Sequence, residues 1–399
     1  MVEIFLTIFF IVVLLFFLGS GIWVALSMIG VSAIGMMLFT SRPVGDAMAT
    51  TIWGTSSSWT LTALPLFVWM GEILFRTKLS ENLFKGLSPW MQRLPGGLIH
   101  VNVVGCALFA AISGSSAATV ATVGKMSIPE LRKRNYPEKI LLGSLAGSGT
   151  LGLLIPPSII LIIYGVAVQE SIAKLFIAGI IPGIMIALIF MTYVIIWSLI
   201  NKKQMPKITE RYSFLEKLKR SKQLLPVLIL ISAVIGSIYS GIATATEAAS
   251  LGVVGALILS YFQKSLTFET FKISLLGATK TSCMIAFILA GSTFLSLAMG
   301  FTGLPRNLAI WIQDMNLSPY VLIFVLMVFY IILGMFLDGI SAVVLTMAII
   351  EPMIRQAGFD MIWFGIFLVI VVEMAQITPP VGFNLFVLQG MANKDMGYI

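Results

Sequence analysis

Long apolar stretches are the feature that most limits what this chain can fold into. They follow one another along almost the whole sequence, and each approaches the 20 or so residues that an α-helix needs to cross about 30 Å of hydrocarbon. We predict nine membrane spans, at residues 2–18, 21–39, 59–75, 141–164, 172–200, 224–239, 243–262, 273–299 and 361–388. Apolar residues make up 58% of the chain and charged residues only 11%, with a mean hydropathy of +1.02, which excludes a water-soluble domain. The first stretch lacks a basic leader and a small-residue cleavage site, so we expect it to be a retained span.

Two further apolar blocks, residues 97–125 and 320–354, are interrupted near their middles by small and polar residues. The interruptions read SGSSAAT at Ser113–Thr119 and LDGIS at Leu337–Ser341. Each block could form one long helix or two short arms that meet at a tip. Clusters of Gly and Ser favour two arms, because they break helices and expose backbone groups. We therefore predict two re-entrant hairpins, an inner one over 97–131 and an outer one over 320–354.

The distribution of basic residues supports the hairpins. If both blocks enter and leave on one side, 21 of the 25 Lys and Arg residues share a side of the membrane. These residues lie in the loops at 76–93, 125–139, 202–222 and 264–280, and at Lys394. The positive-inside rule makes that side cytoplasmic, with 201–223 as a basic linker. The net charge of +8 therefore reflects membrane topology and not a nucleic-acid partner.

An internal repeat relates the two halves of the chain. Pro129 is followed after 27 residues by Pro156, and Pro352 is followed after the same interval by Pro379. The shift along the chain that carries Pro129 onto Pro352 also places Ser115 over Asp338. Five crossings separate the halves, so the second half must be inverted. Paired segments interrupted by Gly and Pro in inverted repeats are typical of secondary transporters.

The predicted fold is therefore an all-α polytopic membrane protein with two inverted-topology repeats of the elevator type. The first repeat covers 1–200 and includes the inner hairpin and a broken span at 138–166. The second covers 224–399 and includes the outer hairpin and a broken span at 361–391. The partner of the 172–200 span should begin near Asn393, and we expect that final helix to be missing.

Two segments mix apolar and polar residues at helical spacing, 79–94 and 304–317. They are typical of helices that lie in the membrane interface, with Trp90 and Trp311 at headgroup level. Ordinary amphipathic connectors are the alternative interpretation.

The two broken spans contain proline pairs inside GSGTLGLLIPPS (147–158) and QITPPVGFN (376–384). A proline pair removes two N–H donors and frees carbonyl groups of the preceding turn. Non-helical backbone at membrane depth survives only when protein buries it or when it lines a watery cavity. The freed carbonyls and neighbouring hydroxyls suit an alkali cation, and the half-helix that follows suits a carboxylate at its N-terminus. The alternative is that these Ser, Thr and Gly residues merely pack helices.

Charged residues at membrane depth are functional candidates. Asp338 at the second tip is the strongest, followed by Glu247 and Glu373, whereas Glu72 could reach the interface. We expect the lone histidine, His100, to be a hydrogen-bonded structural residue.

The sequence shows no catalytic constellation, so we predict that the protein is not an enzyme. It contains no P-loop, no HExxH and no CxxC motif, and one histidine cannot form a multi-histidine metal centre. Cys106 and Cys283 lie far apart in apolar segments, which argues against a disulfide framework. Transport would then draw its energy from an ion gradient or from another subunit.

Several stretches resemble the large membrane (M) subunit of tripartite ATP-independent periplasmic (TRAP) transporters. They are ALPLFVWMGEIL (63–74), SGSSAATVATVGKMSIPEL (113–131), GTLGLLIPPSIILIIYG (149–165), ATEAASLGVVGALIL (245–259), MFLDGISAVVLT (335–346) and ITPPVGFNLFV (377–387). The resemblance implies a sodium-driven elevator carrier in the bacterial inner membrane. It implies two partners, a periplasmic substrate-binding protein and a small four-helix membrane subunit. The implied substrates are small carboxylic acids such as C4-dicarboxylates, sialic acid or other sugar acids.

We expect sodium (Na⁺) at two sites, each formed by a hairpin tip and the facing broken span. The expected ligands are Ser113, Ser115, Ser116, Gly149, Thr150 and Pro156 in the first half, and Asp338, Gly339, Ser341, Thr378 and Pro379 in the second. Asp338 would either bind the cation or cap the following helix. For the substrate we expect Thr119, Ser158, Gly382 and Asn384. A passive channel on the same architecture is the rival interpretation, but the sequence offers no ring of charges to line a pore.

Overall fold

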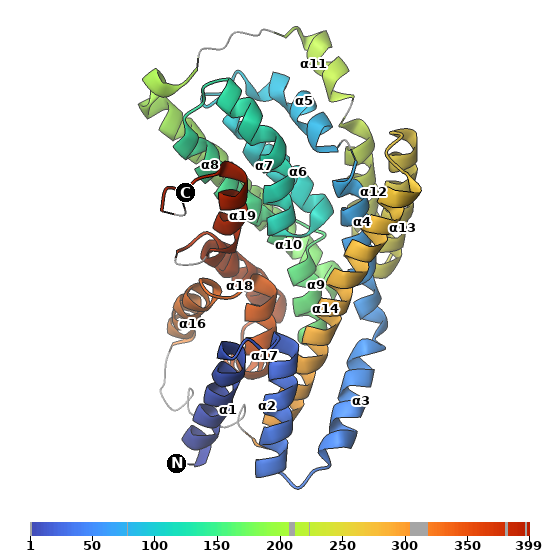
Figure 1. Cartoon of the computed structure of the whole chain (residues 1–399), viewed down its shortest axis with the longest axis vertical. Coiled ribbons are helices and arrows are strands. Elements are labelled where there is room, and N and C mark those ends of the chain that lie inside the picture. The colour runs from blue at the N-terminus through green and yellow to red at the C-terminus, as the bar shows by residue number, and fades with distance from the viewer. Residues whose placement is uncertain are drawn as a thin grey trace.

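The computed structural model describes residues 2–77, 79–206, 212–222, 224–303, 318–379, 382–395 and 397–399. Within these ranges the regular structure consists of α-helices and short 3-10 turns, without a strand (Figure 1). The elements of the first half are α1 Val2–Gly19, α2 Val24–Phe39, α3 Val44–Ser56, η1 Trp59–Thr62, α4 Ala63–Phe75, α5 Leu79–Met91, α6 Ile99–Ser113, α7 Ser116–Lys133, α8 Glu138–Gly149, η2 Thr150–Leu153, α9 Ile159–Ala167 and α10 Ile172–Ile200.

The linker contains η3 Lys202–Gln204 and α11 Phe214–Ser221, and the second half then repeats most of this order. Its elements are α12 Leu225–Tyr239, α13 Ala245–Phe262, α14 Phe268–Phe301, α16 Pro319–Gly334, α17 Gly339–Gln356, α18 Met361–Gln376 and α19 Phe383–Ala392. The shift that superposes the proline patterns carries both ends of α7 onto the ends of α17. The same shift carries the start of α8 onto the start of α18. Each half therefore contains a helical hairpin followed by a broken helix.

The two hairpins lie in opposite parts of the molecule. Helices α6 and α7 occupy the upper part of Figure 1, whereas α17 lies in the lower part. The two broken helices, α8–η2–α9 and α18–α19, meet between the hairpins. The predicted fold class is confirmed: the chain is an all-α membrane protein with two inverted hairpins and two broken helices.

Helix length alone does not separate spans from hairpin arms. Four of the described helices are long and apolar enough to cross a membrane, namely α10, α13, α14 and α17, and two bent helix pairs bring the number to six. Helix α17 passes this test, yet it follows α16 after a turn at residues 335–338 and packs against it. We therefore assign α17 to the outer hairpin.

Two of the described helices, α3 and α11, were not predicted, and α11 lies in the stretch 201–223 that was expected only as a basic linker. Residues 44–56 contain Gly and Thr residues together with Asp46, which weakened the apolar signal, and none of these residues is buried. Helix α3 meets α4 at a bend of 52°, and the pair takes the place that the single 34-residue helix α14 takes in the second half. The predicted interfacial segment 79–94 forms helix α5, Leu79–Met91. The segment 304–317, with Trp311, lies outside the described residues.

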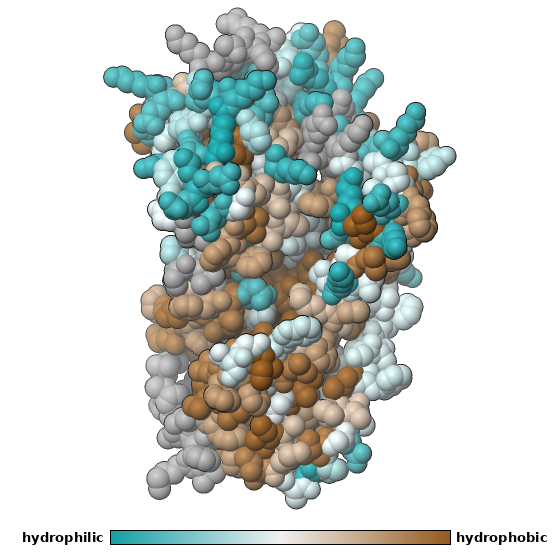
Figure 2. Space-filling model, in the orientation of Figure 1, coloured by the Kyte–Doolittle hydropathy of each residue, from teal (hydrophilic) through white to brown (hydrophobic). Residues whose placement is uncertain are grey.

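The surface separates into a polar end and an apolar belt. Hydrophilic side chains gather at the end that carries α5, α11 and the start of α8, and hydrophobic residues cover the part below (Figures 1 and 2). Helix α10 is an example of the apolar belt. Most of its residues are apolar, and the side chains of Ile181 and Ile200 are 78% and 77% exposed. Such residues face hydrocarbon in a membrane protein. Helices α6, α7, α8, α9, α17 and α18, by contrast, bury half or more of their residues and form the centre of the molecule.

Candidate functional site

The tip of the first hairpin is a turn that requires glycine. Helix α6 ends at Gly114, which has a φ of +59°, in the left-handed region that side chains other than glycine disfavour. The next residue, Ser115, is the N-cap of helix α7, and its side chain accepts a hydrogen bond from the N–H of Ala118 at 3.5 Å. The sequence SGSS therefore ends one helix and begins the next with almost no loop between them.

This tip lies directly on the break in the first broken helix. The N–H of Ile159 donates to the carbonyl oxygen of Gly114 at 3.2 Å. A Cβ atom on Gly114 would lie 2.7 Å from the carbonyl oxygen of Pro157, and one on Gly152 would lie 2.6 Å from that of Ser115. The two backbones are thus as close as glycine allows, and the predicted pairing of this tip with residues 147–158 is present.

Hydroxyl and carbonyl oxygens converge inside the first tip. The hydroxyl groups of Ser113 and Thr119 are 2.9 Å apart, and Thr119 donates to the carbonyl oxygen of Ser115 at 2.7 Å. Thr119 is fully buried, Ser113 is 9% exposed and Ser116 is 5% exposed. Uncharged oxygen ligands in a dry setting suit a cation that has lost its water.

The break itself is held by side chains that bond to the local backbone. Thr150 donates to the carbonyl oxygen of Gly147 at 2.7 Å. Ser158 is the N-cap of helix α9: its hydroxyl accepts from the N–H of Leu161 at 3.3 Å and donates to the carbonyl oxygen of Leu153. The predicted residues Gly149 and Pro156 are buried in the same break. Ser158, predicted to contact substrate, thus already serves as a helix cap.

At the second tip Asp338 caps a helix. Its Oδ2 atom accepts from the N–H groups of Ile340 and Ser341, both at 3.1 Å. This is the capping geometry that the sequence left open as one of two roles for Asp338. The carboxylate also lies at the N-terminus of helix α17, where the helix dipole attracts a negative charge. Asp338 is partly exposed, whereas Gly339 and Ser341 are buried.

The second tip contacts both halves of the chain. A Cβ atom on Gly339 would lie 2.8 Å from Val372 in α18 and 3.3 Å from Ile160 in α9. It would also lie 3.6 Å from the side-chain nitrogen of Gln376. The outer tip therefore rests on its own broken helix and on the half-helix of the first repeat.

In the second broken helix a threonine again bonds to the local backbone, but a glycine stands in place of the serine cap. Thr378 donates to the carbonyl oxygen of Met374 at 2.6 Å. Gly382 has a φ of +55°, and a Cβ atom there would lie 3.3 Å from the carbonyl oxygen of Gln376. Pro379 is exposed, and Pro380 lies outside the described residues.

Two buried polar side chains stand out near this break. Asn384, a predicted substrate residue, is 0% exposed, and neither its amide oxygen nor its nitrogen has a hydrogen-bond partner among the described residues. Glu373 is 3% exposed, and its Oε1 atom likewise lacks a partner there. Buried polar groups are normally bonded, so these atoms are available to a ligand. Gln376, beside the second tip, was not predicted as a site residue. Its position at the start of the QITPP motif, next to the proline pair, could have identified it.

Two other polar residues have structural roles. Glu247 was a candidate charge at membrane depth, but it forms a capping box with Thr244 at the start of α13, and its Oε2 atom accepts from the N–H of Thr244 at 2.8 Å. His100 is buried, and its Nε2 atom lies 2.8 Å from the carbonyl oxygen of Pro95, as expected for a structural histidine. Among the residues that the structure describes, no three His, Cys, Asp or Glu side chains group to hold a metal ion.

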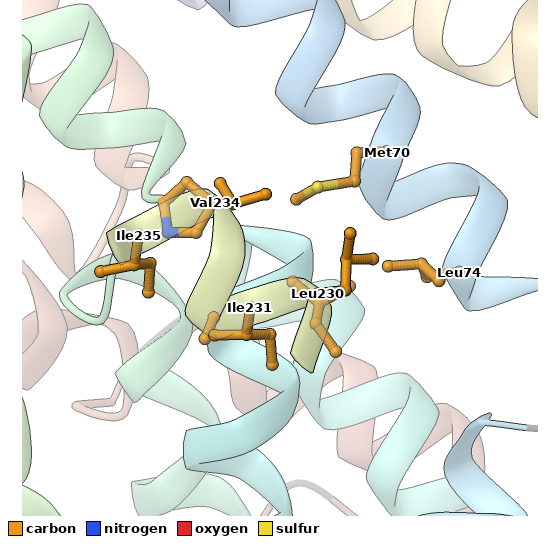
Figure 3. Close-up of a pocket in the computed structure, with 9 residues that line it drawn as sticks. Met70, Leu74, Leu230, Ile231, Val234 and Ile235 are labelled. Carbon is orange, nitrogen blue, oxygen red and sulfur yellow. The ribbon is translucent and has the colours of Figure 1, made fainter. Parts of the chain in front are cut away.

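Helices α4 and α12 contact the end of α6 and the first break through an interface of apolar side chains, called the apolar seam here. Met70 and Leu74 of α4 point toward Leu230 and Val234 of α12 across a small pocket (Figure 3). The pocket has about 210 Å³ of empty volume, including space open to the outside, and its other lining residues are Ala111, Ile112, Pro157, Ile231 and Ile235. The seam thus joins α4 and α12 to the hairpin and the break by side chains without polar groups.

Residues 9–399 match the family described as the DctM component of tripartite ATP-independent periplasmic transporters. The chain belongs to this family. It is therefore a multi-pass membrane component of a TRAP transporter, as the motifs in both halves indicated.

Individual relatives agree with this assignment. The chain is 33% identical over 366 residues to the C4-dicarboxylate TRAP transporter large permease protein DctM of Pseudomonas aeruginosa, and the match covers 92% of this chain and 85% of the relative. It is 31% identical over 378 residues to the sialic acid TRAP transporter large permease protein SiaM of Vibrio cholerae, covering 93% and 86%. The solved structure of the YdaH transporter of Alcanivorax borkumensis is similar in fold, with a TM-score of 0.63 at 12% identity, and the match covers 94% of this chain and 92% of that one.

Proposed function

We propose that this TRAP subunit carries small carboxylic acids across the bacterial inner membrane together with sodium. The observation that carries the proposal is the pair of hairpin tips, each seated on a break in a buried helix. At each of these places the described structure brings a break in a helix together with buried side-chain hydroxyl groups. Backbone carbonyl groups that a break leaves unpaired would add further oxygen ligands.

Sodium would bind between each tip and the break that faces it. The first site would use the buried hydroxyls of Ser113, Ser116 and Thr150 and the half-buried Ser115, with carbonyl groups at Gly149 and Pro156. The second would use carbonyl groups around Asp338, Gly339 and Pro379, with the hydroxyls of Ser341 and Thr378. Because each site joins two elements, a bound cation would hold tip and break together.

The substrate would bind between the two breaks through its carboxylate. Asn384 is the strongest candidate contact, because its buried amide has no partner among the described residues. It lies in the first turn of α19, where unpaired N–H groups favour an anion. Thr119 and Gly382 would line the same region. C4-dicarboxylates and sialic acid, named for the two relatives above, both present a carboxylate.

The hairpins and the broken helices would form a central block that moves, and the outer helices α4, α12 and α14 would belong to a fixed scaffold. Movement of the central block relative to the scaffold would carry the site across the membrane. The apolar seam beside Met70 and Leu230 supports this division, because its lining side chains have no polar contacts that sliding would break. Gly71 of α4 also fits closely against the tip, since a Cβ atom there would lie 3.3 Å from the Cα atom of Ser113.

Two partners would complete the system, a small membrane subunit and a periplasmic substrate-binding protein. The polar end in Figure 2, which carries the basic loops, would face the cytoplasm. Capture of substrate from the periplasm would then fall to the binding protein at the opposite end.

Uptake into proteoliposomes tests the proposal. The large and small membrane subunits would be reconstituted together and supplied with radiolabelled C4-dicarboxylates or sialic acid, with and without the cognate binding protein. We expect saturable uptake of one carboxylic acid that requires the binding protein and external sodium. Uptake that does not saturate would support a channel instead, and uptake that ignores the binding protein would support a stand-alone carrier.

A further inference from the structure

Two arginines occupy equivalent positions at the bases of the two hairpins. The shift that relates the repeats carries Arg132 onto Arg355, and each arginine stands three positions after a proline, in PELR of α7 and PMIR of α17. Each also donates a hydrogen bond to a backbone carbonyl of the other repeat. The two arginine contacts are therefore related by the same symmetry as the two repeats, and each of them joins one repeat to the other.

Arg132 binds the end of the second broken helix. Its Nη2 atom donates to the carbonyl oxygen of Ala392, the last residue of α19, at 2.8 Å. The same atom bonds the carboxylate of Glu138 at the start of α8. Lys394, just past α19, lies 3.3 Å from the other oxygen of Glu138. The base of the inner hairpin is thus joined to α19 in two ways: by the hydrogen bond from Arg132 to Ala392, and through Glu138, which pairs with both Arg132 and Lys394.

Arg355 makes the corresponding contact at the other end of the block. Its Nη2 atom donates to the carbonyl oxygen of Val168, which caps the C-terminus of α9, at 3.0 Å. Its Nε atom lies 2.9 Å from the carboxylate of Glu351, and its Nη2 atom lies 3.9 Å from the carboxylate of Glu170. The outer hairpin is therefore fastened to the half-helix of the first repeat.

The chemistry of helix ends explains why arginine suits both positions. The last carbonyl groups of an α-helix lack partners within the helix and carry a partial negative charge. A guanidinium group can donate to such a carbonyl and to a carboxylate at the same time. The packing agrees, because each hairpin also touches the opposite half-helix: Gly124 of α7 lies against Met391, and Gly339 of α17 lies against Ile160.

We propose that Arg132 and Arg355 are positioning residues that keep both hairpins and both half-helices together as one block throughout transport. The inference rests on the proposed carrier function. Each cation site is bounded by a hairpin whose base is tied to the other repeat, so the two sites cannot separate while the arginine contacts hold. The side chains of Arg132 and Arg355 are 38% and 47% exposed, so their ion pairs contribute little to the stability of the folded protein. Their contribution is to hold the geometry of the block.

Cross-linking across each contact tests the proposal. After Cys106→Ser and Cys283→Ser, one variant would carry Arg132→Cys with Asn393→Cys, and a second would carry Arg355→Cys with Gln169→Cys. Each pair would be joined by a short thiol-cleavable cross-linker in proteoliposomes. We expect the cross-linked proteins to regain uptake relative to the same proteins before cross-linking. Cross-linked protein that is inactive until the linker is cleaved would overturn the proposal, because the contact would then have to open during transport.

Single substitutions give a second, independent readout. Arg132→Gln and Arg355→Gln should each lower uptake by about twofold to thirtyfold at unchanged protein abundance and thermal unfolding, and should raise the sodium concentration for half-maximal uptake. Lysine at either position should restore part of the activity. The matched control is Arg134→Gln, because Arg134 pairs with Glu130 of its own hairpin. Wild-type uptake and sodium dependence in both test variants with glutamine would contradict the proposal. Absence of sodium-dependent uptake in the wild-type protein would instead contradict the proposed function.

Discussion

The backbone N–H of Ile159 donates to the carbonyl oxygen of Gly114 at 3.2 Å, which joins the tip of the first hairpin to the start of helix α9. The bond links two segments that are broken for different reasons, the first by glycine and serine and the second by a proline pair. The N–H group is one that α9 cannot satisfy internally, because it lies in the first turn of the helix. The tip therefore supplies the hydrogen-bond acceptor that the first turn of α9 lacks. A ligand that binds between the tip and α9 must leave room for this hydrogen bond.

Replacement of Gly114 by alanine should disrupt the first tip. Alanine disfavours a φ of +59°, and its Cβ atom would lie 2.7 Å from the carbonyl oxygen of Pro157. We expect a destabilisation of about 1–3 kcal/mol and a strong loss of uptake. Thermal unfolding in detergent and uptake in proteoliposomes measure the two effects. Gly236→Ala in helix α12 is the matched control, since beyond its chain neighbours and the backbone of its own helix nothing lies within 4 Å of its Cβ position.

Removal of one hydroxyl from each tip or break should weaken sodium dependence. Thr378→Val nearly preserves the side-chain volume but deletes an oxygen, and Ser116→Ala does the same at the first tip. Both should raise the sodium concentration for half-maximal uptake without a change in protein abundance. The control is Thr279→Val in α14, because Thr279 bonds the carbonyl oxygen four residues earlier, as Thr378 does. An unaltered sodium dependence in both test variants would place the cation elsewhere.

Substitutions of Asp338 separate its two possible roles. Asparagine keeps a side-chain oxygen that can accept from the N–H groups of Ile340 and Ser341, but it removes the negative charge. Alanine removes the cap and should cost about 0.5–2 kcal/mol in unfolding free energy. If capping is the main role, Asp338→Asn should retain sodium-dependent uptake and Asp338→Ala should not. A loss of sodium dependence in Asp338→Asn with normal thermal stability would show that the carboxylate binds the cation.

The inverted arrangement predicts opposite orientations for the linker and the outer hairpin. In a background with Cys106→Ser and Cys283→Ser, single cysteines at Lys202 and Gln356 would be probed with an impermeant thiol reagent in intact cells. Only the cysteine at Gln356 should react from outside, whereas the one at Lys202 should react after the cells are opened. Lys207, which would serve equally well from its sequence, lies outside the described residues. Labelling of both positions from the same side would contradict the inverted topology.

Much of the fold could be predicted because its breaks are local features of the sequence. Glycine at position 114 and the proline pairs favour breaks in a helix, so the two hairpin tips and the two broken spans followed from the residue types and the repeat. Helix α3 was missed because its polar residues weakened the apolar signal, and α11 was missed because residues 201–223 were interpreted from their basic charge alone.

The contacts between repeats could not be predicted in the same way. Arg132 and Ala392 are 260 residues apart, and Arg355 and Val168 are 187 residues apart. Apolar periodicity identifies a helix and its buried face, but it does not say which helix will cover that face. The sequence therefore placed each hairpin with the break of its own half. The structure adds that the half-helix of the other repeat packs against each hairpin.

A sodium gradient imposed across proteoliposomes tests the central proposal most directly. The vesicles would contain both membrane subunits, equal substrate on the two sides and the binding protein outside. An inward sodium gradient should drive accumulation of the carboxylic acid above its external concentration, and a sodium ionophore should abolish that accumulation. Accumulation that is unchanged when potassium replaces sodium, or that persists after the sodium gradient is dissipated, would contradict sodium coupling.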